Sequence, residues 1–510
     1  MPETSTIILS TLNARYIHSS LGLRYLLANM GTLRKHTRLI EHNIDTRPID
    51  VVEDLLRHQP KIIGLSIYIW NAALSCQVVR LLKQVSPETI IILGGPEVSH
   101  ETAEQEIVRL ADYVITGQAD IAFRETCANL LKNIKPLQKI ITPAPFSIDD
   151  IQFPYDEYSD EDIAHRMIYV EASRGCPFKC EFCLSALDKT VYPFDLDRFL
   201  EQMQTLYDRG VRSFKFIDRT FNLKIDNSIR IMEFFLDKMQ HDNIYLHYEL
   251  IPDHLPEKLK AVIQRFPDHS LQFEIGIQTL NPAIQELISR KQDHDKTINN
   301  MRWIRQQSYA HIHADLIIGL PGEDIHSFAQ GFNELVRMDP HEIQVGVLKR
   351  LRGTPIVRHT EAFGMRYDPS PTYTILSNSL IDFATMQQLK RFARYWDMIA
   401  NSGRFKHTKS FLLGDSAFEN FLVLSNWLYV ETGQSHKIAL LRLFRLLYKA
   451  MTEVLLLDKQ QTIDLLTMDY EACGMKGRPE FVLENPPIDP EVEIKKKRSE
   501  SRQKRHRVNK

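Results

Sequence analysis

The chain has 510 residues, of which 43% are hydrophobic and 25% are charged, and its formal net charge is −2. This length predicts two to four domains of ordinary globular composition, and the small net charge argues against a uniformly basic nucleic-acid-binding protein. The chain opens without a basic leader, and no later run is long and apolar enough to span a bilayer. We therefore expect a cytoplasmic protein with no membrane span.

Four short apolar runs recur in the first 145 residues: 6–10, 62–67, 89–93 and 113–115. Amphipathic, helix-like segments separate them. Buried β-branched runs that alternate with helices predict a parallel, doubly wound, Rossmann-like α/β domain. Ligands of such sheets lie beyond the carboxyl ends of the strands. No G-x-G-x-x-G pattern follows any of these runs, which argues against a nicotinamide or flavin cofactor.

A proline-punctuated and acidic stretch follows this first region, at 136–165. It is too polar and too rich in proline for the interior of a helix or strand. We therefore predict that a first domain covers 1–145 and that 146–165 is a linker.

Three cysteines are clustered directly after the strand-like run 167–170. Cys176, Cys180 and Cys183 are spaced C-x3-C-x2-C. Three thiolates bind three of the four irons of a [4Fe-4S] cluster, so one iron stays open for another ligand. The alternative is a structural zinc site, which usually takes four ligands, and His165 or Asp188 could supply the fourth.

The other three cysteines, Cys76, Cys127 and Cys473, are scattered singly. Such usage is typical of a reducing compartment rather than of a disulfide framework. We expect these three to be inert buried thiols.

Five further strand candidates follow the cysteines: 213–217, 244–250, 271–277, 312–318 and 342–348. Helix-like stretches separate them, so together with 167–170 they predict a partial (β/α)6, TIM-like barrel over 166–355. Chemistry gathers at the carboxyl ends of the strands in parallel barrels, which is where the cysteines lie. Asp218 and Asp315 lie on or directly after two of these strands, and either could contact a substrate or cap a helix.

The cysteine spacing, with Phe178 and Phe182 interleaved and Arg174-Gly175 just before it, resembles the radical S-adenosylmethionine (SAM) enzymes. The open iron of those enzymes binds SAM. The patterns G-L-S-I-Y-I-W-N, L-G-G-P-E-V-S and V-I-T-G-Q-A-D, upstream of this core, resemble the cobalamin-binding domain of cobalamin-dependent radical SAM enzymes. The resemblance implies three cofactors: a [4Fe-4S] cluster, SAM and cobalamin.

Residue roles follow from the same resemblance. Cys176, Cys180 and Cys183 would bind the cluster. For SAM, Gln278 or Glu274 would meet the ribose, Arg290 the carboxylate, and Phe182 with Ile317 the adenine. A surface salt bridge is the alternative for Arg290. The residues implied for cobalamin are Ser66, Tyr68, Asn71, Gly94, Gly95, Pro96 and Gly117.

The chain departs from the family pattern at two places. The D-x-H-x-x-G signature that supplies an imidazole to cobalt is absent around His18, so we expect no protein histidine on cobalt, with His18 as the alternative. The second departure is at 117–120, where relatives often carry a second glycine and an acid.

The remainder of the chain predicts an all-helical accessory domain of unassigned role over 356–485, with Phe392, Trp396, Phe421 and Trp427 as core aromatics. The segments 373–402 and 435–457 carry the clearest helical pattern. Residues 486–510 read as a disordered basic tail, which could contact RNA phosphates or be solvated.

The resemblance implies a cobalamin-dependent radical SAM enzyme that methylates an unactivated carbon through a 5′-deoxyadenosyl radical, with flavodoxin or ferredoxin as a low-potential electron donor. One alternative is a rearrangement or cyclisation by the same cofactors. Another is an RNA-binding or scaffold protein with a structural metal site. The sequence does not identify the substrate.

Overall fold

The computed structural model describes residues 6–188, 190–477 and 479. These residues form two compact units, which are described separately. The first unit runs to Glu249 and also includes residues 349–357 and 368–374. The second contains residues 250–348, 358–367 and the chain from Ile375 onward.

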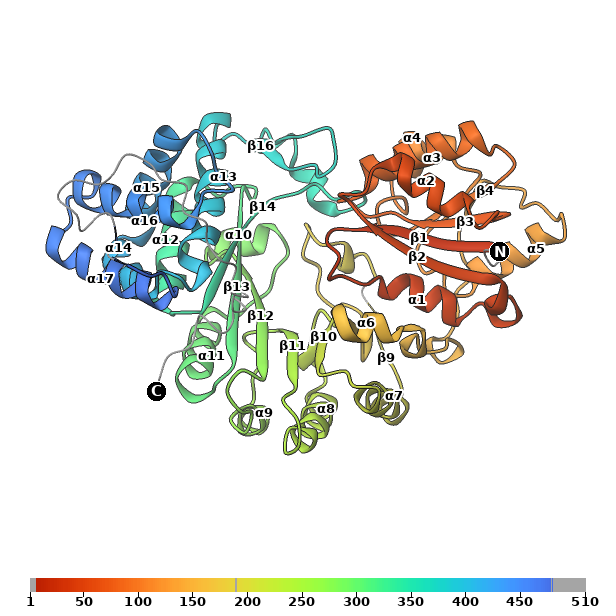
Figure 1. The fold of residues 1–510 in the computed structure, drawn as a ribbon, viewed down its shortest axis with the longest axis horizontal. Coiled ribbons are helices and arrows are strands. Elements are labelled where there is room, and N and C mark those ends of the chain that lie inside the picture. Colours follow the sequence, from red (N-terminus) through yellow and green to blue (C-terminus); the bar gives the residue numbers. More distant parts are fainter. Residues whose placement is uncertain (1–5, 189, 478, 480–510) are drawn as a thin grey trace. The chain divides into compact units, whose positions relative to one another are not determined.

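The first unit begins with a six-stranded parallel sheet in the order β2-β1-β3-β4-β5-β6 (Figure 1). Strand β1 pairs with the edge strand β2 on one side and with β3 on the other, with Ile7 opposite both Thr37 and Ile62. The strands are β1 (Ile7–Asn13), β2 (Thr37–Asn43), β3 (Ile62–Ser66), β4 (Ile90–Gly94), β5 (Tyr113–Ile115) and β6 (Ile140–Ile141). The four apolar runs are therefore strands, as expected.

Helices cover both faces of this sheet, which confirms the doubly wound arrangement (Figure 1). Side chains of α2 (Pro48–Leu56), α3 (Ala72–Val85) and α4 (Glu106–Leu110) pack on one face, and those of α1 (Leu21–Ala28) and α5 (Ala122–Leu131) pack on the other. The Ser20 side chain caps α1 by accepting a hydrogen bond from the amide of Leu23.

The sequence analysis missed β2 and β6. Strand β2 has the mostly polar sequence TRLIEHN and lies at an edge of the sheet, where only Thr37 is fully buried. An edge strand needs no continuous apolar run, because one side of it faces away from the core. The apolar pattern therefore identifies only the central strands.

A second set of parallel strands follows in the first unit, in the order β11-β10-β7. These are β7 (Ile168–Val170), β10 (Ser213–Phe216) and β11 (Tyr245–Leu250), with α7 (Leu196–Asp208) and α8 (Ile225–Lys238) between them in sequence. Phe199, Phe216 and Phe235 are fully buried among these elements. The strands expected at 167–170, 213–217 and 244–250 are confirmed.

The stretch before β7 is packed rather than irregular, which corrects the expectation that it contains no regular element. It forms two short 3-10 turns and α6 (Asp160–His165). The buried Tyr155 hydroxyl hydrogen-bonds to both backbone groups of Glu171, and the Tyr158 hydroxyl does the same at Tyr169. These two side chains satisfy backbone groups along β7, a role that composition alone does not reveal.

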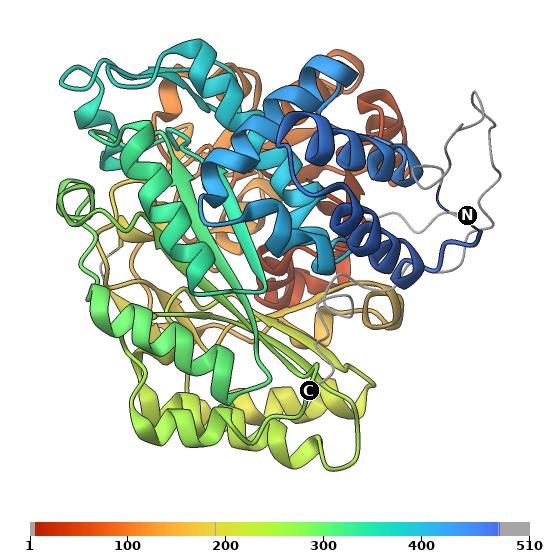
Figure 2. The same ribbon diagram turned by 90° about the vertical axis from the view of Figure 1, so that its left-hand side faces the viewer.

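The second unit contains the remaining three expected strands as parallel neighbours, in the order β14-β13-β12. They are β12 (Leu271–Gln278), β13 (His311–Ile318) and β14 (Glu342–Val347). The helices near them are α9 (Glu257–Ile263), α10 (Pro282–Leu287), α11 (His294–Gln307) and α12 (Ile325–Arg337). Figure 2 shows green helices of this part of the chain running alongside its strands.

The end of the second unit is mainly helical, as expected. It contains α13 (Phe383–Met398), α14 (Lys406–Leu413), α15 (Ala417–Thr432), α16 (Leu440–Lys449) and α17 (Lys459–Ala472), with a small hairpin of β15 (Arg366–Tyr367) and β16 (Ile375–Ser377) before them. The first helix of this region therefore begins ten residues later than expected. Phe392, Trp396 and Phe421 are fully buried core residues, whereas Trp427 is half-buried under Lys449.

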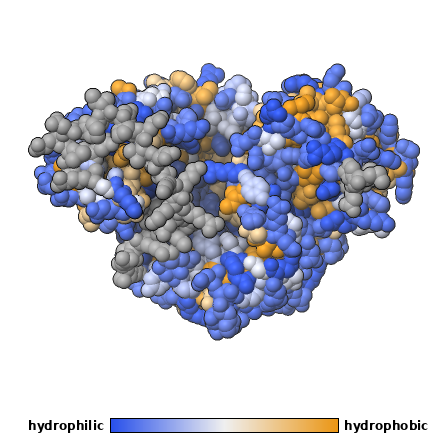
Figure 3. Space-filling model, viewed as in Figure 1, coloured by the Kyte–Doolittle hydropathy of each residue, from blue (hydrophilic) through white to orange (hydrophobic). Residues whose placement is uncertain are grey.

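Hydrophilic residues cover most of the coloured surface on the face seen in Figure 3. None of the helices within the described residues is long and apolar enough to cross a membrane. Of the isolated thiols, Cys127 is buried, and burial raises its pKa to about 12, while Cys76 and Cys473 are only half-buried. The predicted basic tail, 486–510, lies outside the described residues.

Candidate functional site

The three clustered cysteines occupy one loop directly after β7. Cys176 and Cys180 are each 8% exposed, Cys183 is half-buried, and none of the three forms a disulfide. An antiparallel pair, β8 (Ser173–Gly175) and β9 (Val191–Pro193), joins the two ends of the loop. Within it, the amide of Cys183 donates to the carbonyl of Cys180 at 3.0 Å. The sequence analysis found the cysteines but not the hairpin that closes their loop.

The donor set of this loop suits an iron-sulfur cluster, because three thiolates are typical cluster ligands. No three His, Cys, Asp or Glu side chains among the described residues are already gathered around a metal position. The zinc alternative finds no support at either suggested fourth ligand. His165 is exposed at the end of α6, and the Asp188 carboxylate accepts hydrogen bonds from the amide and hydroxyl of Thr190.

Asp218 supports the start of the cysteine loop from the end of β10. Its carboxylate accepts hydrogen bonds from the Ser173 hydroxyl at 2.6 Å and the Ala172 amide at 3.0 Å. Burial raises the pKa of Asp218 to about 7, although these hydrogen bonds act in the opposite direction. Asp218 caps no helix, so one of its two expected roles is wrong.

Arg174 connects the cysteine loop to the N-terminal sheet domain. Its guanidinium forms ion pairs with Glu171 at 2.8 Å and with Asp120 at 3.2 Å. It also lies over the ring of Tyr25, 4.6 Å from the centroid. The pKa of Arg174 is raised because these carboxylates outweigh the effect of its burial. Asp120, in the segment that departs from the family pattern, therefore has a defined partner.

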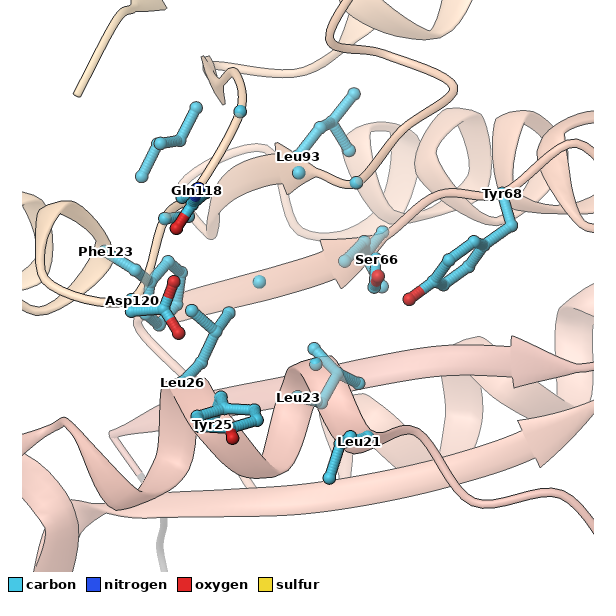
Figure 4. Close-up of a pocket in the computed structure, with 18 of the residues that line it drawn as sticks. Leu21, Leu23, Tyr25, Leu26, Ser66, Tyr68, Leu93, Gln118, Asp120 and Phe123 are labelled. Atoms are coloured by element: carbon cyan, nitrogen blue, oxygen red, sulfur yellow. The ribbon is translucent and has the colours of Figure 1, made fainter. Parts of the chain in front are cut away.

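A cavity of about 330 Å³ lies at the carboxyl ends of β3, β4 and β5. Figure 4 shows side chains of α1, including Leu23 and Tyr25, across from Ser66, Leu93 and Gln118. Glu171, Arg174 and Ile217, from the region of the cysteine loop, line the same cavity. One cavity therefore joins the N-terminal sheet to the segment that carries the cysteines.

Five of the seven residues predicted for cobalamin line this cavity: Ser66, Tyr68, Gly94, Gly95 and Gly117. Gly95 has a φ of +103°, and a Cβ there would lie 2.5 Å from the carbonyl oxygen of Ile67, so only glycine allows this close approach.

Asn71 and Pro96 are not among the residues that line the cavity. The fully buried Asn71 amide donates to Leu12 and Ser66 carbonyls and accepts from the Tyr68 amide. Asn71 thus holds the backbone of the loop that carries Tyr68. Pro96 is half-buried beside Gly95. Both residues therefore lie outside the cavity lining, and their assignment to cobalamin stays a prediction.

His18 is not a cavity residue either. Its Nδ1 lies 2.7 Å from the hydroxyl of Tyr169, and burial, with nearby Lys215 and Arg15, lowers its pKa. The sequence analysis missed several lining residues, namely Leu21, Leu23, Tyr25, Leu26, Gly64 and Phe123. A glycine inside the apolar run of β3 was the available signal for Gly64, since strand glycines mark close approaches.

In the second unit, Gln278 and Arg290, two residues expected to bind SAM, both lie beside Gly276. Glu274 and Gln278 lie on the same half-buried face of β12, since side chains alternate along a strand. A Cβ at Gly276 would lie 2.5 Å from the Gln278 amide nitrogen and 3.5 Å from the Arg290 guanidinium. Arg290 donates to the Gly276 carbonyl and to the Gln292 side chain. Gln278 has a φ of +70°, a strained conformation that clusters at functional sites.

For the other residues expected near SAM, the structure gives only their position and burial. Ile317 is half-buried on β13, and Phe182 is half-buried within the cysteine loop of the first unit. Asp315 lies inside β13, 3.6 Å from the His313 ring, and so caps no helix.

Glu323 is a buried carboxyl that follows β13. One of its oxygens accepts a hydrogen bond from the Thr279 hydroxyl at 2.5 Å, while the other is buried without a partner. Burial raises its pKa to about 7. Through Thr279 it supports the chain just after Gln278.

Three segments of the chain match known families. Residues 8–126 match the B12 binding domain, and residues 170–335 match the radical SAM superfamily. Residues 361–510 match a family of proteins of unknown function, DUF4080.

Individual relatives agree with these matches. An uncharacterized methyltransferase, PH0819, from Pyrococcus horikoshii is 25% identical over 59% of this chain and 70% of its own length. The cobalamin-dependent radical SAM methyltransferase TokK from Streptomyces tokunonensis is 23% identical over 62% of this chain, which spans about half (51%) of TokK. The solved structure of the radical SAM methyltransferase TsrM from Kitasatospora setae, with cobalamin and a [4Fe-4S] cluster bound, has a TM-score of 0.58. Its identity is 12%, and the match covers 92% of this chain and all of TsrM, which shows a shared fold.

The two family matches contain the two features described above, since the cavity glycines lie within 8–126 and the cysteine loop lies within 170–335. A free three-thiol loop suits a [4Fe-4S] cluster that binds SAM, and a cavity at the strand ends of a B12-binding domain suits cobalamin. The chain therefore combines a B12 binding domain with a radical SAM domain.

Proposed function

We propose that this enzyme is a methyltransferase that acts on an unactivated carbon. The observation that carries the proposal is the position of Arg174, which lies two residues before Cys176 and also lines the cavity at the end of the N-terminal sheet. One side chain therefore borders both cofactor sites. PH0819 and TokK, both described as methyltransferases, support the reaction type.

Cys176, Cys180 and Cys183 are proposed to hold the cluster, which leaves one iron open for SAM. When bound, these cofactors supply a 5′-deoxyadenosyl radical for hydrogen removal and a methyl group carried by the corrinoid. We assign Gln278 or Glu274 to the ribose, Arg290 to the SAM carboxylate, and Phe182 with Ile317 to the adenine. The fork of the Arg290 guanidinium suits a carboxylate, since it can donate two parallel hydrogen bonds.

Ser66, Tyr68, Gly94, Gly95 and Gly117 are proposed to contact cobalamin. A volume of 330 Å³ lies near the lower limit for pockets of drug-sized ligands, so the cavity would enclose only part of a corrinoid. Apolar residues such as Leu23, Ile92 and Phe123 line it beside the glycines. This lining favours the flat nucleotide base of the corrinoid tail, which is able to lie against exposed backbone.

The protein's own contribution to the reaction would be orientation and exclusion of water. The Arg174 pairs with Glu171 and Asp120 fix the loop before Cys176, and the Asp218 hydrogen bonds fix the preceding backbone. Neither interaction depends on a bound cofactor. The cysteine loop therefore has a defined starting geometry, although its thiols are not gathered around a metal position.

The remaining proposals concern partners and location. A flavodoxin or ferredoxin is proposed as electron donor, because radical SAM chemistry needs a low-potential electron. The six free cysteines fit a cytoplasmic location, where thiols stay reduced. An RNA contact through the basic tail predicts binding that falls steeply with salt and disappears when residues 491–510 are deleted.

The direct test is anaerobic reconstitution with iron, sulfide and hydroxocobalamin, followed by incubation with a low-potential chemical reductant, methyl-labelled SAM and fractionated cell extracts. We expect cluster absorbance, 5′-deoxyadenosine and a product heavier by one labelled methyl group. Protein reconstituted without hydroxocobalamin should give no labelled product. A product of unchanged carbon count, formed together with 5′-deoxyadenosine, would instead indicate rearrangement or cyclisation and would overturn methyl transfer.

A further inference from the structure

Two short segments from the later part of the chain belong to the first compact unit. They are residues 349–357 and 368–374, which we call the strap. The two halves are joined by a bridge between Lys349 and Thr374, and the Arg350 amide donates to the Tyr373 carbonyl at 3.0 Å. The strap therefore has its own backbone pairing.

Side chains of the strap bind the loop that follows β4 through ion pairs and a hydrogen bond. Arg350 forms a two-pronged ion pair with Glu101 at 2.9 and 3.3 Å, and Arg352 bridges Glu97 and Glu101 at 3.0 Å each. The Tyr373 hydroxyl donates to Glu97 at 2.6 Å, and the Arg352 guanidinium lies over the Tyr373 ring. Glu97 is 5% exposed, and charge-assisted hydrogen bonds are strong in such partly desolvated positions.

The loop bound by the strap positions two glycines that line the proposed corrinoid cavity. Between Glu97 and Glu101 lies Ser99, whose hydroxyl donates to the Gly95 carbonyl at 2.8 Å and accepts from the Gly117 amide at 3.1 Å. Both glycines line the cavity. A displacement of this loop would therefore displace the backbone that faces the ligand.

The other end of the strap reaches the cysteine loop. The Ile356 amide donates to the carbonyl of Glu181 at 3.0 Å. Glu181 lies between Cys180 and Cys183 and is 2% exposed. Only three residues separate Arg352 from Ile356, so one short segment contacts both the loop behind the cavity and the backbone between two cysteines.

We propose that the strap couples occupancy of the corrinoid cavity to the conformation of the cysteine loop, and that Arg352 is its central positioning residue. A corrinoid that fixes Gly95 and Gly117 would fix Ser99 and its neighbours, then Arg352, and through Ile356 the carbonyl of Glu181. Coupling of this kind is reciprocal, so filling the cluster site would also tighten corrinoid binding. The inference rests on the proposed assignment of the cavity to cobalamin.

The test compares Arg352→Met with the wild-type protein and with Arg47→Met. Methionine retains a flexible apolar stem but removes both ion pairs. Arg47 forms an equally two-pronged pair with Asp50 on the exposed surface of the same domain, and so provides a matched control. Affinity for hydroxocobalamin is measured by absorbance titration. Hydrogen-deuterium exchange of peptides covering 176–184 is measured with and without hydroxocobalamin, before any cluster is added.

We expect hydroxocobalamin to slow exchange in 176–184 of the wild-type protein and of Arg47→Met. Arg352→Met should bind it at least tenfold more weakly and should show no slowing of exchange at saturation. Tyr373→Phe removes the hydroxyl that donates to Glu97 and accepts from Arg352. It keeps both ion pairs of Arg352 and the ring beneath its guanidinium, so a smaller loss of about threefold is expected. This milder variant decides the question if Arg352→Met fails to fold.

Normal affinity together with normal slowing in both strap variants would overturn the coupling and leave the proposed function intact. Weaker affinity with undiminished slowing at saturation would also overturn it, since the strap would then support only the cavity. A wild-type protein that binds no hydroxocobalamin would overturn the cavity assignment, and with it this inference.

Discussion

The region around the cavity and the helical region of the second unit are held together by different interactions. Around the cavity, Arg24, Arg174 and Arg352 each join two carboxylates, and each guanidinium side chain is at most 18% exposed. The helical region instead packs aromatic rings, namely Phe332, Phe392, Trp396, Phe418 and Phe421. All five of these rings are nearly or fully buried.

This difference follows from the kind of backbone that each region must stabilise. Loops at the ends of strands have no ladder of backbone hydrogen bonds, so directional contacts are needed to fix them, and a guanidinium supplies several donors in a rigid fork. Packed helices already satisfy their own backbone, so non-directional burial of rings is sufficient. The comparison predicts that mutations near the cavity change cofactor binding, whereas mutations among the rings change only stability.

The largest effect is expected at the cluster itself. Cys180→Ala should abolish cluster absorbance and 5′-deoxyadenosine formation, because two thiolates remain where three are needed. Hydroxocobalamin affinity of Cys180→Ala should stay within twofold of that of the wild-type protein before any cluster is added. Cys473→Ala is the matched control and should retain both cluster and activity. Full cluster loading of Cys180→Ala would contradict the assignment of the loop.

Trp396→Ala tests the aromatic region. Removing this fully buried ring should lower the free energy of unfolding of the second unit by about 3–5 kcal/mol, since large-to-small core changes lose both burial and packing. Urea titration followed by circular dichroism measures the change. Val430→Ala, on the 83% exposed Val430 side chain, should change it by less than about 0.5 kcal/mol. Hydroxocobalamin affinity should be unchanged in both, and a tenfold loss in Trp396→Ala would break the comparison.

Arg24→Met tests a buried ion pair of the first unit. The Arg24 guanidinium is 2% exposed and pairs with Glu41 at 2.8 Å and Asp162 at 2.9 Å. Removing the guanidinium leaves both carboxylates without that partner, which should lower the free energy of unfolding by about 3–5 kcal/mol. Arg34→Met removes a half-exposed pair with Glu157 and should cost less than about 1 kcal/mol. Equal costs for the two variants in urea titrations would show that burial does not set the value of these pairs.

Glu323→Gln tests a buried carboxyl of the second unit, the unit that also contains the packed aromatic rings. Its pKa rises from 4.5 to about 7 on folding, so the unfolded chain loses this proton at lower pH than the folded chain does. The wild-type protein should therefore lose stability as the pH rises from about 4.5 to about 7, by at most about 3 kcal/mol. Glutamine keeps the acceptor for Thr279 and cannot ionise, so this loss should disappear.

The measurement is the difference between urea midpoints at pH 5 and pH 7.5. Glu361→Gln, at an exposed position of the same unit, should behave as wild type. If Glu323→Gln kept the full pH dependence of the wild type, another group would be responsible for it.

The sequence predicted the parts of the fold that depend on local pattern. Buried β-branched runs identified β1, β3, β4 and β5, and three cysteines with fixed spacing identified the loop. Strand β2 was not predicted, because an edge strand tolerates polar residues. Gln278 and Arg290, which are predicted to bind SAM, were singled out only through family resemblance, although the structure brings both to Gly276.

The strap and the tyrosine contacts along β7 could not be predicted in this way. Arg352 and Glu97 are 255 positions apart, and a lone arginine after a strand carries no sign of its partner. Asn71 shows the converse ambiguity. A buried amide that holds its own loop has the same sequence appearance as one that contacts a ligand, and only its hydrogen bonds to Leu12 and Ser66 distinguish the two.

Gly117→Ala is expected to weaken cofactor binding less than Gly95→Ala does. Gly117 lines the cavity with a φ of +65°, and an added Cβ would meet nothing within 4 Å. The only penalty is then that of holding an alanine in the left-handed backbone conformation of the bound state, about 1 kcal/mol. This penalty weakens hydroxocobalamin binding by roughly fivefold. At Gly95 the same change would place Cβ 2.5 Å from the Ile67 carbonyl oxygen, so Gly95→Ala should lower affinity far more. Absorbance titration of both variants tests this order, and equal losses would show that strain rather than contact limits the cavity walls.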